Sequence, residues 1–190
     1  MSRIFWVRHG PTHAKSMVGW SDLPADLSDR DRLDRLADFL PREAPVISSD
    51  LIRATATADA IARDRPRLPH DPDLREMHFG AWELKRHNEI EDQVHARAFW
   101  ETPGDLGPPG GESWNTLSAR VDRAVNRIFN QYPESDIIAV AHFGVILTQL
   151  QKALGLTAYE TFSFRIDNLS VTELNRTNTG WHAERVNHLP

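Results

Sequence analysis

Three short apolar runs constrain the fold of this chain more than any other feature of its sequence. They are rich in β-branched and aromatic residues, have the length of strands buried on both faces, and lie at residues 3–7, 45–49 and 136–141. Alternating runs that predict further strands follow at 161–166, 169–174 and 181–186. Because segments of helical periodicity separate the first three runs, the sequence predicts an α/β fold, a three-layer α/β/α sandwich around a mostly parallel central sheet.

The predicted helices begin at residues that favour helix N-termini. Ser28 and Asp50 are each expected to cap a helix, the second of which is rich in small residues over 51–64. Glu112 or Ser113 is expected to open a third helix with a long apolar stripe. These helices would cover the sheet on its two faces.

A less regular part of the chain lies between the second and third apolar runs. We expect a polar helix around 86–100 and a loop over 102–113, which is rich in proline and glycine. A further helix is expected over 145–154, after the third run. The whole chain, 1–190, is predicted to form one domain, with a small lid-like excursion at about 84–111.

Composition excludes several classes of site. The chain has 190 residues, a net charge of −5 and no cysteine, which excludes disulfides, thiolate nucleophiles and sulfur-ligated metals. The charge balance gives no indication of a nucleic-acid or membrane partner, and the apolar run at 137–147 is too short to cross a bilayer. The first residues lack the features of a secretory signal, so a cytoplasmic location is expected.

Polar residues of distinctive chemistry follow the ends of two predicted strands. Arg8, His9 and Gly10 come directly after the first apolar run, and His142 comes directly after the third. In open α/β sheets, ligands bind beyond the carboxyl ends of the strands. We therefore expect both imidazoles at the same edge of the sheet, where Gly10 would let the backbone approach a ligand closely.

These side chains, together with Arg53, have the chemistry of a phosphate-ester site. Two guanidiniums, Arg8 and Arg53, can each bind the oxygens of a phosphate dianion bidentately, and they stay charged at any relevant pH. A neutral His9 can attack phosphorus in line and carry the phosphoryl group as a covalent intermediate. His142 would donate to the oxygens as negative charge develops on them. Because the arginines supply positive charge, no metal or other cofactor is expected.

Seven stretches of the sequence, in order and spread over nearly the whole chain, resemble one known family. They are "VRHGPT" (7–12), "GWSDLPADLS" (19–28), "SSDLIRATATA" (48–58), "LREMHFGAWE" (74–83), "PPGGES" (108–113), "VAHFGVI" (140–146) and "NLSVTEL" (168–174). The family is the histidine phosphatase superfamily, which includes phosphoglycerate mutase and α-ribazole phosphatase. The short chain most resembles the α-ribazole phosphatase branch and the broad-specificity, phosphoglycerate mutase-like branch. The resemblance implies a phosphoglycerate mutase-like fold, His9 as the nucleophile, and a phosphate pocket made by Arg8, Arg53 and His142.

Glu76 is the expected general acid and base. It would protonate the departing alkoxide and then deprotonate the water that cleaves the phosphohistidine. Glu83 is a competing carboxylate seven residues further on. The family pattern places the acid in the "LRE" stretch and so favours Glu76.

Three further residues are expected to bind substrate. The resemblance places Thr12 at a hydroxyl position that assists the pocket, and Trp20 is expected at the mouth of the site. Phe143 stands where the family usually has a small residue, so its ring must narrow or reshape the pocket. Pro11 likewise replaces the Glu or Gln that is common after the "RHG" triplet.

Three functions are compatible with this set of residues. The first is a phosphatase that acts on a small phosphorylated metabolite and releases inorganic phosphate. The second is a phosphoglycerate mutase, which would use the same intermediate but needs longer segments to enclose its substrate than 84–111 provides. The third is a non-catalytic module that binds a phosphorylated ligand, which the presence of both His9 and Glu76 disfavours.

A metal site is the remaining alternative. His9 and His13 have the i, i+4 spacing of a helical metal pair, but Gly10 and Pro11 argue against a helix there. The other histidines are predicted to be structural or surface residues: His70, His78, His87, His95, His182 and His188.

Overall fold

A five-stranded mixed sheet forms the centre of the protein, whose computed structural model describes residues 2–190. The strands are β1 (Ser2–Arg8), β2 (Val46–Ser48), β3 (Ile137–Ala141), β4 (Val171–Thr177) and β5 (Gly180–His188), in the order β2-β3-β1-β4-β5. The β2–β3 and β3–β1 pairs are parallel, whereas the β1–β4 and β4–β5 pairs are antiparallel. Four of the five strands therefore run in one direction, and the predicted α/β class is confirmed.

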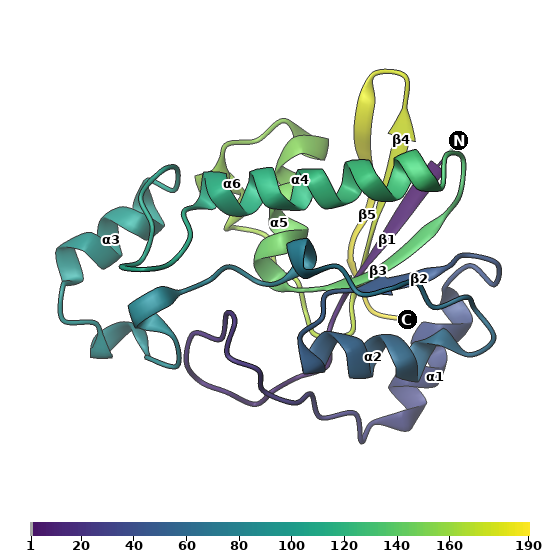
Figure 1. Ribbon diagram of the computed structural model, residues 1–190, viewed down its shortest axis with the longest axis horizontal. Coiled ribbons are helices and arrows are strands. Elements are labelled where there is room, and N and C mark those ends of the chain that lie inside the picture. The colour runs from purple at the N-terminus through teal and green to yellow at the C-terminus, as the bar shows by residue number, and fades with distance from the viewer. Residues whose placement is uncertain (1) are drawn as a thin grey trace.

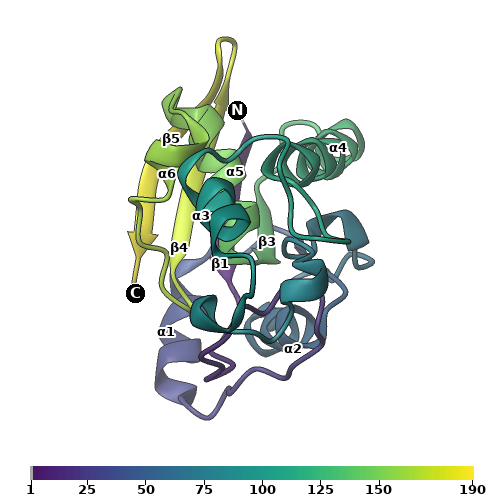
Figure 2. The ribbon, with the colours of Figure 1, turned by 90° about the vertical axis from the view of Figure 1, so that its left-hand side faces the viewer.

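Helices cover both faces of the sheet (Figure 1). The α-helices are α1 (Arg30–Phe39), α2 (Ile52–Ala62), α3 (Gln93–Glu101), α4 (Trp114–Gln131), α5 (Phe143–Leu154) and α6 (Ala158–Thr161), and the 3₁₀ helices are η1 (Pro72–Leu74), η2 (Gly80–Trp82) and η3 (His87–Glu89). In Figure 1, α1 and α2 lie below the sheet and α4 lies above it. Helix α3 lies at the end of the molecule that faces the viewer in Figure 2. In residues 2–190 no helix is both long and apolar enough to cross a membrane.

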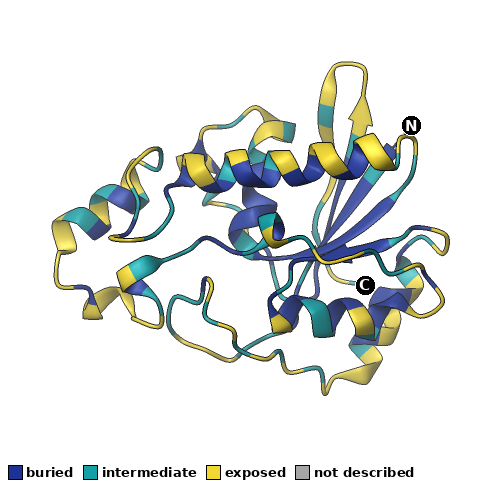
Figure 3. Ribbon diagram, viewed as in Figure 1, coloured by how far each residue is buried: buried dark blue, intermediate teal, exposed yellow. Residues whose placement is uncertain are grey.

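Alternate residues of the central strands point into two separate cores. Ile4 and Trp6 of β1 pack with the buried faces of α4 and α5, whereas Phe5 and Val7 pack with those of α1 and α2. This is the period-two alternation of a strand, here apolar on both sides because both faces are covered. Figure 3 shows the central strands in dark blue for most of their length. The two cores confirm the three-layer sandwich.

Two predicted N-caps are wrong. The cap of α1 is Asp29 rather than Ser28, and its carboxylate accepts a hydrogen bond from the Arg32 N–H at 3.1 Å. Asp50 does not cap α2 because both of its oxygens bind the Arg75 guanidinium, at 2.6 and 2.7 Å. The carboxylate that local spacing assigned to the helix N-terminus is instead bound bidentately by an arginine from a distant segment.

Three other elements differ from the predictions. Residues 161–166 do not form a strand, because a capping box between Thr157 and Glu160 starts the short helix α6 instead. The polar helix expected around 86–100 is divided into η3 and α3, and Asp92 caps α3. Helix α5 begins at Phe143 rather than at 145, with His142 at its N-cap.

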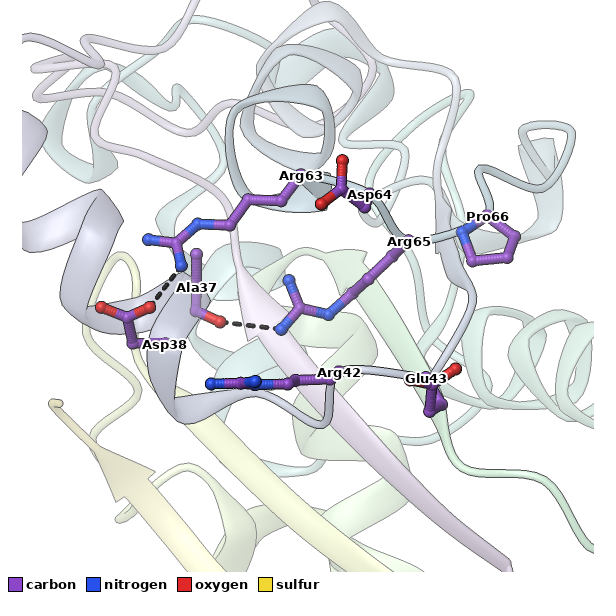
Figure 4. A pocket seen from close by; sticks show the side chains of 8 residues that line it. All are labelled: Ala37, Asp38, Arg42, Glu43, Arg63, Asp64, Arg65 and Pro66. Atoms are coloured by element: carbon purple, nitrogen blue, oxygen red, sulfur yellow. Dashed lines mark hydrogen bonds and ion pairs between the residues drawn. The ribbon is translucent and has the colours of Figure 1, made fainter.

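A buried arginine holds the C-terminal ends of α1 and α2 together. Arg65 donates to the carbonyls of Ala37 in the last turn of α1 and of Leu40 directly after it, both at 2.8 Å, and to that of Ile61 near the end of α2, at 3.0 Å. Its Nε–H donates to the Pro41 carbonyl at 2.7 Å. Figure 4 shows this side chain at a hollow between the helices. Carbonyls in the last turn of a helix have no partner within it, so one guanidinium satisfies such groups at the ends of both helices.

Replacing Arg65 with Met should lower the free energy of unfolding by about 2–4 kcal/mol, because several carbonyls lose a charged donor. Urea denaturation measures this loss. Arg42→Met is the matched control, since it removes the same charge from an exposed side chain at the same hollow (Figure 4) and should change stability by less than about 0.5 kcal/mol. Equal losses in the two variants would contradict the proposed role of the buried guanidinium.

Candidate active site

The parallel pairing of β1 with β3 brings the two predicted histidines together. Arg8 is in register with Ala141, and the next residue, His9, donates its backbone N–H to the Ala141 carbonyl at 3.1 Å. His9 therefore follows β1 at the same edge at which His142 follows β3. The centroids of the two imidazole rings are 5.0 Å apart, and the rings are inclined at 57°.

The His9 imidazole is held in one tautomer. Its Nδ1 lies 2.7 Å from the Gly10 carbonyl oxygen, which can only accept, so Nδ1 carries the proton. Its Nε2 accepts from the Arg53 Nε–H at 3.3 Å. Burial, followed by the charge of Arg53, lowers the pKa of His9 to about 3. The ring is therefore neutral at neutral pH, with the Nε2 lone pair on the side of Arg53.

The backbone around His9 is also held from two distant segments. Thr57 of α2 accepts from the Gly10 N–H at 2.9 Å, and the Asn168 side chain donates to the His9 carbonyl at 2.8 Å. A Cβ on Gly10 would lie 2.6 Å from a methyl group of Leu27. Glycine at position 10 thus lets the loop at 25–27 pack closely against it, and its φ is not unusual.

Two guanidiniums lie beside the imidazoles and are held by backbone carbonyls. Arg53 donates to the carbonyls of Gly19 and Ser21, at 2.6 and 2.9 Å. Arg8 donates to the Ile166 carbonyl at 2.5 Å, and its Nε–H is buried without a partner in the part of the chain that the structure describes. A guanidinium has five N–H donors, so both side chains keep donors that can bind an anion.

His142 is fully buried and is oriented by a serine. Its Nε2 lies 2.6 Å from the Ser49 hydroxyl, and within residues 2–190 its Nδ1 is buried without a partner. Burial and the neighbouring His9 lower the pKa of His142 well below its ordinary value. If the serine hydroxyl donates to Nε2, the proton of the neutral ring is on Nδ1, where it can bind a phosphate oxygen. The sequence analysis missed Ser49, although it follows β2 at the same sheet edge.

Glu76 approaches the two histidines from the segment after η1. Its two carboxyl oxygens accept from the backbone N–H groups of Met77, at 2.8 Å, and Gly144, at 3.1 Å. A Cβ at position 144 would lie 2.5 Å from Glu76 Oε1, so this approach requires glycine there. Burial raises the pKa of Glu76, although both N–H groups and the two arginines oppose the shift. A raised pKa makes a proton available to a leaving group.

A largely buried ion pair, which the sequence analysis missed, holds the segment that carries Glu76. Arg120 of α4 binds both carboxylate oxygens of Glu112, at 2.6 and 2.8 Å, and donates to the carbonyls of Arg75 and Glu76, at 2.9 and 3.2 Å. Glu112 in turn accepts from the His78 N–H at 2.9 Å. The sequence carries one signal for this ion pair, because Arg120 is a charged residue on the apolar face of the predicted helix.

Glu83, the competing carboxylate, has a different position. It accepts from the backbone N–H groups of Gly19, Trp20 and Ser21, at 3.1, 2.7 and 3.3 Å. These N–H groups belong to the loop whose carbonyls bind Arg53. Glu83 therefore acts as an anchor for the loop that orients Arg53.

The three predicted substrate-binding residues contact different groups. Phe143 places its ring 5.4 Å from the Arg8 guanidinium carbon, in a cation–π arrangement. Trp20 donates its indole N–H to the Glu76 carbonyl at 2.8 Å and is partly exposed. Thr12 lies further along the loop, and its hydroxyl accepts a long 3.4 Å hydrogen bond from the Ala14 N–H.

The alternative metal pair is not assembled. His13 binds the Asp26 carboxylate through Nε2 at 2.7 Å, whereas the His9 ring faces the Gly10 carbonyl and the Arg53 guanidinium. Among residues 2–190, no group of three or more His, Cys, Asp or Glu side chains is arranged to hold a metal ion.

Comparison with known proteins gives the same family from sequence and from structure. The profile of the histidine phosphatase superfamily (branch 1) matches residues 4–189. The chain is 29% identical over 174 residues to the adenosylcobalamin/alpha-ribazole phosphatase of Escherichia coli K12, covering 87% of this chain and 85% of that protein. It is 34% identical over 171 residues to the glucosyl-3-phosphoglycerate phosphatase of Mycolicibacterium vanbaalenii, covering 81% and 75%. The solved structure of Bacillus stearothermophilus YhfR matches with a TM-score of 0.90 and 26% identity, covering 100% of this chain and 98% of that one.

The chain belongs to the histidine phosphatase superfamily, so the predicted resemblance is confirmed. Within that superfamily it is a phosphatase, a hydrolase of phosphate monoesters.

The low pKa of His9 predicts that its ring stays neutral between about pH 5 and pH 8. Burial and the charge of Arg53 both disfavour the imidazolium, so the pKa of His9 is lowered to about 3. Ring ¹⁵N chemical shifts should therefore show an Nδ1–H tautomer that does not change over this range. The His9→Asn variant assigns the signal, and a titration midpoint near the ordinary value of about 6.5 would contradict the prediction.

Proposed function

We propose that this phosphatase hydrolyses a phosphate monoester of a small metabolite through a phosphohistidine on Nε2 of His9. The observation that carries the proposal is the buried, neutral His9 ring, whose Nδ1–H is committed to Gly10 while its Nε2 faces Arg53. Nε2 is thus an available nucleophile beside two cationic side chains. The relatives described above are named for small phosphorylated compounds, which supports a substrate of that class.

In the first step the Nε2 lone pair attacks phosphorus, an N–P bond forms and the bond from phosphorus to the ester oxygen breaks. Arg8, Arg53 and His142 bind the three other phosphoryl oxygens and stabilise their charge. The Glu76 carboxyl gives its proton to the departing oxygen, so the first product leaves as an alcohol.

In the second step the Glu76 carboxylate takes a proton from a water molecule as the water oxygen attacks phosphorus. The N–P bond breaks and its electron pair returns to Nε2 of His9. Inorganic phosphate is released, with Glu76 protonated and His9 neutral, as at the start. No metal or other cofactor enters either step.

A phosphoglycerate mutase would form the same intermediate but return the phosphoryl group to its substrate. The phosphatases among the relatives favour transfer to water. The module that only binds a phosphorylated ligand is disfavoured by the contacts that position both His9 and Glu76.

We further propose that residues 1–190 act as one domain and that 84–111 is a lid-like excursion over the site. Helix α3 lies within this segment and extends away from the sheet in Figure 1. The ring of Trp100 on α3 lies 5.7 Å from that of Phe162 and 6.4 Å from that of Phe79. These contacts connect the excursion to the side of the site on which Glu76 lies.

Replacing His9 with Ala should lower kcat/KM for an aryl phosphate by about 10³-fold or more, because no other group can take the phosphoryl group. Release of inorganic phosphate measures the loss, and circular dichroism checks that the variant is folded. His182→Ala, which changes an exposed histidine on β5, should leave turnover unchanged. Appreciable turnover by a folded His9→Ala protein would refute the proposed nucleophile.

Replacing Glu76 with Gln should slow the first turnover of an alkyl phosphate by about 10²–10⁴-fold. The first turnover of 4-nitrophenyl phosphate should slow much less, because its leaving group needs little protonation. In the unchanged enzyme the acid form of Glu76 acts, so kcat/KM for the alkyl ester should fall as pH rises through the raised pKa of Glu76. The Gln variant should lack this alkaline limb.

Rapid-quench measurement of the released alcohol separates the first turnover from later ones. Equal slowing of the two esters, or an alkaline limb that persists in the variant, would show that another group protonates the leaving oxygen.

A further inference from the structure

An apolar cavity of about 50 Å³ lies on the side of the site where Glu76 is found. The general acid itself forms part of its wall. The other lining residues include five aromatic side chains and one glycine: Phe79, Trp100, Trp114, Phe143, Phe162 and Gly144.

The aromatic walls come from segments that are far apart in the sequence. Trp100 belongs to α3, Phe143 is the first residue of α5, and Phe162 follows α6. Phe162 packs edge-to-face against Trp100 at 5.7 Å and against Trp114 at 5.1 Å. These contacts fix the rings that form the cavity, and the ring of Phe143 also meets the Arg8 guanidinium. The phosphate-binding groups and the aromatic cavity are therefore contiguous.

The position of Glu76 decides what must occupy the cavity. A general acid has to lie within hydrogen-bond distance of the oxygen that it protonates. That ester oxygen is one bond from phosphorus and one bond from the first carbon of the leaving alcohol. With phosphorus at His9, the first atoms of the alcohol must therefore lie at the wall that Glu76 forms.

The chemistry of the walls decides which alcohols fit. Apart from the Glu76 carboxyl, the side chains at the cavity are aromatic or apolar, and the indole N–H of Trp114 is already bonded to Gln151 at 2.8 Å. A hydroxyl or carboxylate next to the ester oxygen would lose its water without gaining partners, which is unfavourable. A ring or alkyl group would lose only unfavourable contact with water.

We propose that the substrate is a phosphate monoester whose alcohol carries an apolar, aromatic group next to the ester oxygen, and that Trp100, Phe143 and Phe162 select it. The inference rests on the proposed phosphatase mechanism and names the substrate class of the same site. A cavity that holds a whole benzene ring measures about 150 Å³, so the edge of a ring enters here. The remainder of the alcohol lies against the partly exposed faces of the aromatic side chains.

Benzyl phosphate and glycerol 1-phosphate test this selection, because both are alkyl esters whose leaving groups need protonation. We expect kcat/KM to be at least about tenfold higher for benzyl phosphate. Replacing Trp100 with Ala should reduce that ratio about fivefold or more, mainly through a higher KM for benzyl phosphate. Trp100→Gln, which keeps more of the side-chain volume than alanine does, should also reduce the ratio of the two kcat/KM values. Trp181→Ala is the matched control, since this tryptophan packs on Phe129 instead, and it should leave the ratio within twofold.

Two results would overturn the inference while the mechanism stands. One is hydrolysis of glycerol 1-phosphate at least as efficient as that of benzyl phosphate, and the other is an unchanged ratio in both Trp100 variants. If neither ester nor 4-nitrophenyl phosphate releases inorganic phosphate, the proposed function fails and this inference fails with it.

Discussion

The hydrogen bond from Nδ1–H of His9 to the Gly10 carbonyl is the interaction on which the rest of the site depends. Because that carbonyl accepts, it keeps the proton on Nδ1 and leaves the lone pair on Nε2, where the Arg53 Nε–H opposes protonation. The backbone that supplies the carbonyl is in turn held by Thr57 and Asn168. A neutral imidazole can therefore persist beside cationic groups at a pH where a histidine in water would be partly protonated.

Positive charge at the site is concentrated in a chain of net charge −5. Arg8 and Arg53 are both oriented by backbone carbonyls, which hold a guanidinium in place without neutralising it. The carboxylates nearby bind other groups. Glu83 anchors the loop that orients Arg53, and Glu112 binds Arg120, which holds the segment of Glu76. This division leaves the charge of the two arginines available for a phosphate group.

The sequence was sufficient to predict five of the strands, because apolar and alternating runs carry that information locally, and the five residues expected at the site lie close together in the structure. The side-chain contacts that it missed have a common cause. Asp50, Glu83 and Arg120 bind partners 25, 63 and 45 residues away in the chain, the last being the Arg75 carbonyl, and no local pattern reports such pairs. The strand predicted at 161–166 failed differently, since the capping box that begins at Thr157 was present in the sequence and outweighed the alternating pattern.

The position of the phosphoryl group on the His9 ring tests this account most directly. Rapid mixing with an aryl phosphate, followed by alkaline quench and ³¹P NMR or mass spectrometry of the peptide, identifies the phosphorylated nitrogen. The account predicts phosphate on Nε2 of His9 during turnover. A phosphoryl group on Nδ1, or turnover with His9 unmodified, would contradict it. In either case the hydrogen bond to Gly10 would not determine which nitrogen attacks phosphorus.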